Sequence, residues 1–373
     1  MSDAALSPDD LRAAVAAGHL SEAQAAGLTS LAQERAGRRA AMPKIDEPFE
    51  LYRGFNEIFV SIGVILLLSG LGFFLPGSTI FDFESTGASF AASYTGVSVF
   101  MSVLIWALSE YFTRRRRMIA PSIVLVLYLT YTLGTGGAFA LISLAGVDSI
   151  QPLIAAFTVG TLAAAAFYLR FRLPFALFPA GVCTLAAALT AVGLVDEGAL
   201  DRFKDEGWSV FVDIGAGTAF PLVTLVFGLA GFALAMRHDL RDPHRVTRHA
   251  ACGFWLHLLA APAIVNTAAF TLYASGGGAA TAGLVVFLLA MAAVALVIDR
   301  RSFLLSGIGY VAVLLVIGLG DQNFAVVLIL LGVLILGLGA GWVGLRAALM
   351  RALPEFPGKD RLPPYAVSTE AEA

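Results

Sequence analysis

Apolar runs long enough to cross a membrane follow one another from about residue 55 to residue 348. The hydrocarbon core of a bilayer is about 30 Å thick, and a helix needs roughly 20 residues to cross it. The pattern therefore predicts an all-α, polytopic membrane fold with ten spanning helices. The predicted spans are residues 57–75, 92–113, 118–145, 151–170, 174–195, 210–236, 249–273, 278–298, 302–319 and 323–346.

Only the span at 118–145 allows an alternative, because it is longer than a straight crossing needs and has three glycines within residues 134–137. It is either one kinked helix or a helix broken into two parts. With ten spans, all Lys and Arg residues except Arg202 and Lys204 fall on one side, whereas two separate crossings here would move twelve basic residues to the other side. Basic residues concentrate on the cytoplasmic side of membrane proteins. We therefore expect ten spans and two cytoplasmic termini.

Composition agrees with a membrane class. Apolar residues make up 58% of the chain and charged residues 14%, and the mean hydropathy is +0.82, which lies outside the range of soluble globular proteins. The lipid bilayer is thus the expected partner, and the inner (plasma) membrane of a bacterium the expected location. A net charge of −3 gives no basic surface for nucleic acid.

The polar ends of the chain are predicted to form separate parts. The N-terminal segment predicts two short helices, the first capped by Ser7 and ended by Gly18, the second opened by a capping box of Ser21 and Gln24. Such a pair is too small to be stable through its own core, so we expect it to dock on the membrane domain, a second copy or a cytoplasmic protein. The predicted parts are a helical module with a basic linker at 1–45, a membrane domain at 55–348, and a Pro-containing cytoplasmic tail at 349–373.

The N-terminal segment also carries a resemblance. Residues 17–24 read Ala-Gly-His-Leu-Ser-Glu-Ala-Gln, and residues 56–63 read Asn-Glu-Ile-Phe-Val-Ser-Ile-Gly. The first stretch resembles the N-terminal module, and the second the start of the membrane region, of a large family of bacterial multi-pass membrane proteins of unknown function. The resemblance implies a short helical module before a polytopic membrane region, and it implies no activity.

His257 is the main candidate for a functional group inside the membrane. It lies eight residues, about 12 Å along a helix, from the inner end of the span 249–273. Ionisable groups are costly in a membrane and often functional, and the unperturbed pKa of imidazole lies near physiological pH. His257 would relay protons or sense pH; the alternative is a neutral histidine bonded to a neighbouring helix. Asn266 would extend the site only if Pro262 kinks the helix, because nine residues place it on the opposite face.

A second candidate site follows one face of the span at 118–145. Tyr128, Tyr131, Thr132 and Thr135 recur there at helical spacing, just before the glycines. At a broken helix these groups would line a path for a solute or ion. In a continuous helix they would bond to neighbouring helices or to their own backbone.

Glu57 and Asp213 form a candidate charge site at the ends of spans. Each is expected at a helix N-terminus, where the helix dipole stabilises a carboxylate, and the two lie on opposite sides of the membrane. Glu110 is expected to pair with Arg114 one turn later. Asp299 is interpreted in the same way, as a local partner of the two arginines that follow it.

No catalytic motif is present in the sequence, which has no HExxH, rhomboid-type serine motif or P-loop, so we expect neither an enzyme nor a cofactor. The segment 237–249 holds three histidines and two aspartates, but its four arginines would repel a cation, so no metal is expected. Small residues spaced along the last span would support packing within the chain or a homo-oligomer.

Two hypotheses for function follow. The first is a permease- or channel-like protein for a small solute or ion. The second is a non-transporting scaffold or sensor that recruits a partner through its N-terminal module. A cavity that collects His257, Tyr131 and Thr135 would favour the first hypothesis. Scattered polar groups, each bonded locally, would favour the second.

Overall fold

A computed structural model describes residues 8–21, 24, 28, 54–75, 88–147, 150–243, 245, 247–319, 323–363 and 365. The chain divides into two compact units, Met1–Asp46 and Glu47–Ala373. In the first unit, α1 covers Pro8–Ala16. The Ser21 amide donates to Gln24 Oε1 (2.9 Å) and the Gln24 amide donates to Ser21 Oγ (3.2 Å), which confirms the predicted capping box. Ser7 and most of the second predicted helix lie outside the described residues.

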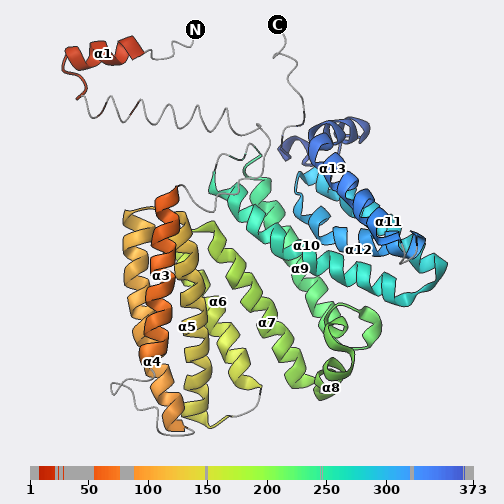
Figure 1. The fold of residues 1–373 in the computed structure, drawn as a ribbon, viewed down its shortest axis with the longest axis horizontal. Coiled ribbons are helices and arrows are strands. Elements are labelled where there is room, and N and C mark those ends of the chain that lie inside the picture. Colours follow the sequence, from red (N-terminus) through yellow and green to blue (C-terminus); the bar gives the residue numbers. More distant parts are fainter. Residues whose placement is uncertain are drawn as a thin grey trace. The chain divides into compact units, whose positions relative to one another are not determined.

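Every regular element that the structure describes in the second unit is helical, as the apolar pattern predicts (Figure 1). The long helices are α3 (Phe55–Phe74), α4 (Ala88–Ser109), α5 (Ile119–Ala145), α6 (Gln151–Phe171), α7 (Leu177–Val195), α9 (Phe220–Asp239), α10 (Arg248–Ser275), α11 (Gly277–Ile298), α12 (Ser302–Leu319) and α13 (Phe324–Ala352). A shorter helix, α8 (Glu197–Glu206), lies between α7 and α9. The all-α prediction is confirmed.

Nine helices in the described part of the chain are long and apolar enough to cross a membrane. The one predicted span outside these nine, 302–319, corresponds to α12, whose 18 residues reach about 27 Å at 1.5 Å per residue. That length is close to the hydrocarbon thickness of about 30 Å. The structure therefore supports a membrane protein, and the crossing by α12 stays a prediction.

The helices of the second unit pack in two groups joined by α7 (Figure 1). In the first group α5 lies against α3, α4 and α6. In the second group α10 contacts α9, α11 and α12, while α13 contacts α11 and α12. Because α7 touches α6 on one side and α9 and α10 on the other, the two groups form one continuous domain.

The third predicted span is a single helix, α5, with no break at its glycines. A Cβ on Gly134 would lie 2.8 Å from the carbonyl oxygen of Ala156 in α6, and a Cβ on Gly137 would lie 2.8 Å from Cγ2 of Val159. Both distances are shorter than packed side chains allow. The glycines therefore permit close contact between α5 and α6, as small residues do at helix interfaces in membranes, and they do not divide the helix.

Candidate functional site

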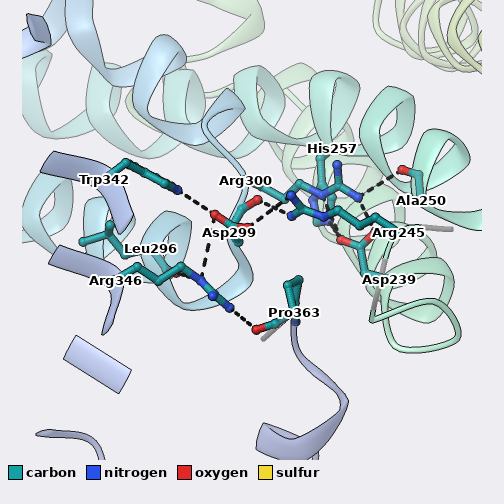
Figure 2. A network of polar contacts seen from close by, with 10 residues as sticks. All are labelled: Asp239, Arg245, Ala250, His257, Leu296, Asp299, Arg300, Trp342, Arg346 and Pro363. Carbon is teal, nitrogen blue, oxygen red and sulfur yellow. Dashed lines mark hydrogen bonds and ion pairs between the residues drawn. The ribbon is translucent and has the colours of Figure 1, made fainter. Parts of the chain in front are cut away.

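A cluster of charged side chains is buried where the ends of five helices meet (Figure 2). It joins the C-terminal end of α9, the N-terminal part of α10, the turn between α11 and α12, and the C-terminal part of α13. Sequence analysis assigns all of these ends to the cytoplasmic side. We call this set the charge cluster; its members are Asp239, Arg245, His257, Asp299, Arg300 and Arg346.

Asp239 is the centre of the first half of the charge cluster. Arg300 binds it through two bonds, Nη2 to Oδ1 at 2.6 Å and Nε to Oδ2 at 3.0 Å. His257 Nε2 lies 2.9 Å from Oδ2 of the same carboxylate. Arg300 Nη2 also donates to the carbonyl oxygen of Ala250, at 3.0 Å. One carboxylate at the end of α9 thus ties together α10 and the start of α12.

Asp299 is the centre of the second half. Arg245 approaches it with Nη1 at 3.1 Å from Oδ2, and Arg245 Nη2 donates to the Asp299 carbonyl oxygen at 2.6 Å. Trp342 of α13 donates its indole N–H to Oδ1 at 2.6 Å. Arg346, one turn later, lies 3.9 Å from the carboxylate and donates to the carbonyl oxygens of Leu296 and Pro363. The second half therefore holds α13 and the segment after it against α11.

The backbone conformation at Asp299 directs two adjacent residues into different halves of the charge cluster. Asp299 has a left-handed conformation, with φ of 57°, directly after the last residue of α11. This conformation is uncommon for residues other than glycine, although Asp tolerates it better than most. Consequently the adjacent side chains of Asp299 and Arg300 point to different partners (Figure 2). The interpretation of Asp299 as a local partner of the following arginines is wrong for this reason.

A glycine makes room for the first half. A Cβ on Gly253, one turn before His257 in α10, would collide with Asp239 Oδ1 and lie 3.2 Å from Arg300 Nη2. Only glycine allows the carboxylate and the guanidinium to approach the α10 backbone this closely. The sequence thus provides, at one helix position, the space that the ion pair occupies.

Burial makes these contacts energetically important. His257 is fully buried, and Arg300 and Asp299 are 1% and 2% exposed. A carboxylate only accepts hydrogen bonds, so the bond to Asp239 places the neutral imidazole's proton on Nε2. His257 Nδ1 and Arg300 Nη1 then have no hydrogen-bond partner among the described residues. Buried charges of this kind are strongly destabilising when one partner is lost.

The other residues predicted to share a site with His257 do not join the charge cluster. Asn266 lies further along α10, where its carbonyl oxygen accepts a 3.4 Å hydrogen bond from Tyr310 of α12. Tyr128 bonds to Ser69 of α3 at 2.6 Å. Thus the structure does not place these groups beside His257.

The remaining hydroxyls of α5 also lie away from His257. Thr135 bonds to the carbonyl oxygens of Tyr131 and Thr132 in its own helix. Tyr131 is 66% exposed and Thr132 is buried within α5. His257, in contrast, is surrounded by Phe232 of α9 and Phe303 of α12. The α5 stripe and the charge cluster are therefore two separate features.

Glu57 lies in the first turn of α3, as predicted, but its carboxylate also bonds to a second helix. Its Oε2 accepts hydrogen bonds from the backbone amides of Ile119 and Ala120, both at 3.1 Å. These amides open α5, whose N-cap residue Met118 supplies no side-chain bond. Glu57 therefore caps the neighbouring helix, and the contact places the N-termini of α3 and α5 at the same end of the bundle.

We expect Glu57→Ala to lower the free energy of unfolding by about 0.5–2 kcal/mol, the usual effect of removing an N-cap acceptor. Glu57→Gln retains an acceptor oxygen and should lose clearly less. Denaturant titrations of the two purified variants check this expectation. Equal losses would show that the bonds to α5 do not account for the role of Glu57.

Asp213 does not begin a membrane-spanning helix, so its predicted position is wrong. Its Oδ1 accepts a 2.8 Å bond from the Gly215 amide and caps the short 3₁₀ helix η5 (Ile214–Ala216). The left-handed Gly217 ends this turn, and α9 starts afterwards with Pro221 in its first turn. The sixth predicted span therefore began about ten residues too early, because the residues of the two 3₁₀ helices before α9, Gly207–Phe211 and Ile214–Ala216, are also mostly apolar.

Glu110 forms the predicted pair with Arg114, at 3.4 Å. A second partner was not predicted. Arg170, at the end of α6, donates from Nε to Glu110 Oε1 at 2.8 Å, and its Nη2 lies 2.7 Å from the same oxygen.

Among the residues that the structure describes, no group of three or more His, Cys, Asp or Glu side chains could hold a metal ion. His238 and His249 contact each other, with their Nδ1 atoms 2.9 Å apart.

Sequence reasoning selected His257 but missed its partners. The missed partners lie at or near helix ends: Asp239, Arg245, Arg300 and Arg346. The positive-inside pattern already explains basic residues at these ends, so the three arginines carried no further signal. The available signal was the single acidic residue at the end of each of α9 and α11, since a carboxylate does not suit the negative end of a helix dipole.

No family model, curated protein or solved structure matches this chain. The resemblance of residues 17–24 and 56–63 to bacterial multi-pass membrane proteins therefore stays a prediction.

Proposed function

We propose that this chain is a permease of the inner (plasma) membrane, with both termini in the cytoplasm, that moves a small solute or ion. The observation that carries the proposal is the convergence of five helix ends on the charge cluster. Its ion pairs act as the cytoplasmic gate. A path between α9, α10 and α12 opens at this end only when Asp239 separates from Arg300.

Two physical arguments support a gate. Buried ion pairs contribute little net stability compared with well-packed apolar residues, so their presence among membrane helices favours a functional role. Ion pairs between separate elements can also exchange partners when the elements move, as interface ion pairs do in known switching proteins. His257 adds a proton-accepting Nδ1 beside Asp239, which would couple the gate to protons.

The second candidate function is a scaffold or sensor that recruits a cytoplasmic partner through residues 1–45. It is favoured by the α5 hydroxyls, which bond within α5 or to α3 and away from His257, the scattered arrangement expected of a scaffold or sensor. The separate compact unit Met1–Asp46 also favours it, and the permease proposal rests on the charge cluster alone. The two candidates differ in what they bind: a permease binds a small solute or ion, whereas a scaffold binds a protein.

A thermal-shift screen separates them. The full chain and its His257→Ala variant are compared in detergent across pH values, ions and a library of small solutes. A ligand at 100 times its dissociation constant stabilises the protein by about 2.7 kcal/mol. We expect at least one such shift in the wild type and its loss in the variant. A screen without shifts, with cooperative unfolding of both proteins, would favour the scaffold.

A further inference from the structure

An apolar groove lies on the second helix group, apart from the charge cluster's ion pairs. Its volume is about 650 Å³, and it is lined mainly by α11, α12 and α13. Trp342 lines it but uses its indole N–H to bind Asp299. Apart from Trp342, the only polar side chains in the lining are those of Arg301 and Ser302. The groove is therefore a hydrocarbon-like space with polar groups at one end.

The polar end is built from the start of α12. Arg301 is an exposed residue, and its guanidinium carbon lies 5.4 Å from the centre of the Trp342 ring. Ser302 is only 8% exposed, and its Oγ has no hydrogen-bond partner among the described residues. Both residues stand at a helix N-terminus, where the backbone dipole favours an anion. A guanidinium, a buried hydroxyl and this dipole together suit a phosphate group.

The dimensions of the groove match one leaflet of a bilayer. Along α12 it extends from Ser302 to Leu314, twelve residues or about 18 Å. Half of a hydrocarbon core of about 30 Å is about 15 Å. Sequence analysis assigns the start of α12 to the cytoplasmic side, so Arg301 would lie at the depth of the inner headgroups, where anionic lipids are attracted to basic residues.

We propose that this groove binds one anionic phospholipid, with an acyl chain between α11, α12 and α13 and the phosphate at Arg301 and Ser302. The proposal is independent of the proposed transport function, because a scaffold in the same membrane would hold the same lipid. Binding between weakly packed helices would fix α13, which has few buried residues in its apolar part.

Two glycines of α13 provide a matched pair of variants. Gly339 lines the groove, whereas Gly337 does not, and a Cβ at either position meets no atom within 4 Å. Gly339→Leu therefore fills the groove without a backbone collision, and Gly337→Leu adds the same side chain elsewhere on the helix. Arg301→Gln removes the cation, and Arg237→Gln removes another exposed arginine, at the end of α9, as its control.

Native mass spectrometry of the full, delipidated chain tests the proposal with two probes, palmitoyl-oleoyl phosphatidylglycerol and palmitoyl-oleoyl phosphatidylcholine. We expect one phosphatidylglycerol per chain, bound at least about tenfold more tightly than phosphatidylcholine. Both lipids carry the phosphate, but the choline ammonium would bring a like charge beside Arg301. Gly339→Leu should abolish binding of both lipids, and Arg301→Gln should remove the preference. Both control variants should bind as the wild type does.

Three results would overturn the proposal. The first is equal affinity of the wild type for the two lipids, which would show that the site does not select an anionic headgroup. The second is unchanged phosphatidylglycerol binding by Gly339→Leu, which would place the lipid elsewhere. The third is loss of binding by Gly337→Leu while it unfolds at the wild-type temperature, which would show that the effect is not specific to the groove.

Discussion

Asp239→Ala is expected to lower the free energy of unfolding by about 3–5 kcal/mol, the usual result of removing one partner of a buried ion pair. The variant leaves Arg300 buried without its carboxylate, and it removes the bond to His257. Denaturant titration of the purified chain, followed by helix content, measures the loss. This is the largest single-residue effect that we expect in the molecule.

Two comparisons make this expectation specific to burial. Asp201→Ala removes an acid whose side chain is 74% exposed and paired to Lys204 on α8, and it should leave the free energy of unfolding unchanged within the error of the titration, as is usual for exposed ion pairs. The double variant Asp239→Ala with Arg300→Met removes both charges, so it should lose less than Asp239→Ala alone. A loss in the double variant equal to the sum of two single losses would mean that the two residues do not act as a pair.

Gly253→Ala is expected to lower the free energy of unfolding by about 1–3 kcal/mol, the typical cost of overpacking. The added methyl group would collide with Asp239 Oδ1 and lie 3.2 Å from Arg300 Nη2. These atoms belong to a bidentate ion pair and cannot withdraw without breaking it. The same denaturant titration measures the effect.

Gly231→Ala is the matched control, because Gly231 also faces a neighbouring helix. A Cβ there would lie 3.5 Å from the Cβ of Ala260, an ordinary contact distance. Alanine is favoured over glycine in a helix by up to about 1 kcal/mol, so this variant should be neutral or more stable. If both alanine variants behaved alike, the space at Gly253 would not be reserved for the ion pair.

The membrane helices could be predicted from the sequence, because they depend on composition and on the length of the apolar runs. Long apolar runs give membrane helices because each must satisfy its backbone internally, and the described helices follow those runs closely. The three glycines of α5 were compatible with a break and with close packing. Only the position of Ala156 on α6 decides between these interpretations, and that position depends on tertiary packing.

Partners of charged groups could not be predicted in the same way. Asp239 and Arg300 lie 61 residues apart, and Arg245 and Asp299 lie 54 residues apart. Nearer residues offered simpler explanations for each charge. The left-handed backbone at Asp299 redirects two adjacent side chains to different helices, and no periodicity in the sequence indicates such a turn. His257 is conspicuous in the sequence because it is an ionisable residue within an apolar run. Its partner Asp239 is not conspicuous, because it lies among basic residues at the end of a helix.

The most direct test of the gate uses the thiol of Cys252, one residue before Gly253. Cys252 is buried beside Tyr168, so it reacts with a hydrophilic maleimide only when the cytoplasmic ends of the helices open. Cys183 of α7 is the internal control, because global unfolding would expose both thiols. In liposomes we expect Asp239→Asn to accelerate labelling of Cys252 at least about tenfold, without a change at Cys183. Labelling of Cys252 at the wild-type rate would contradict a gate held closed by the charge cluster.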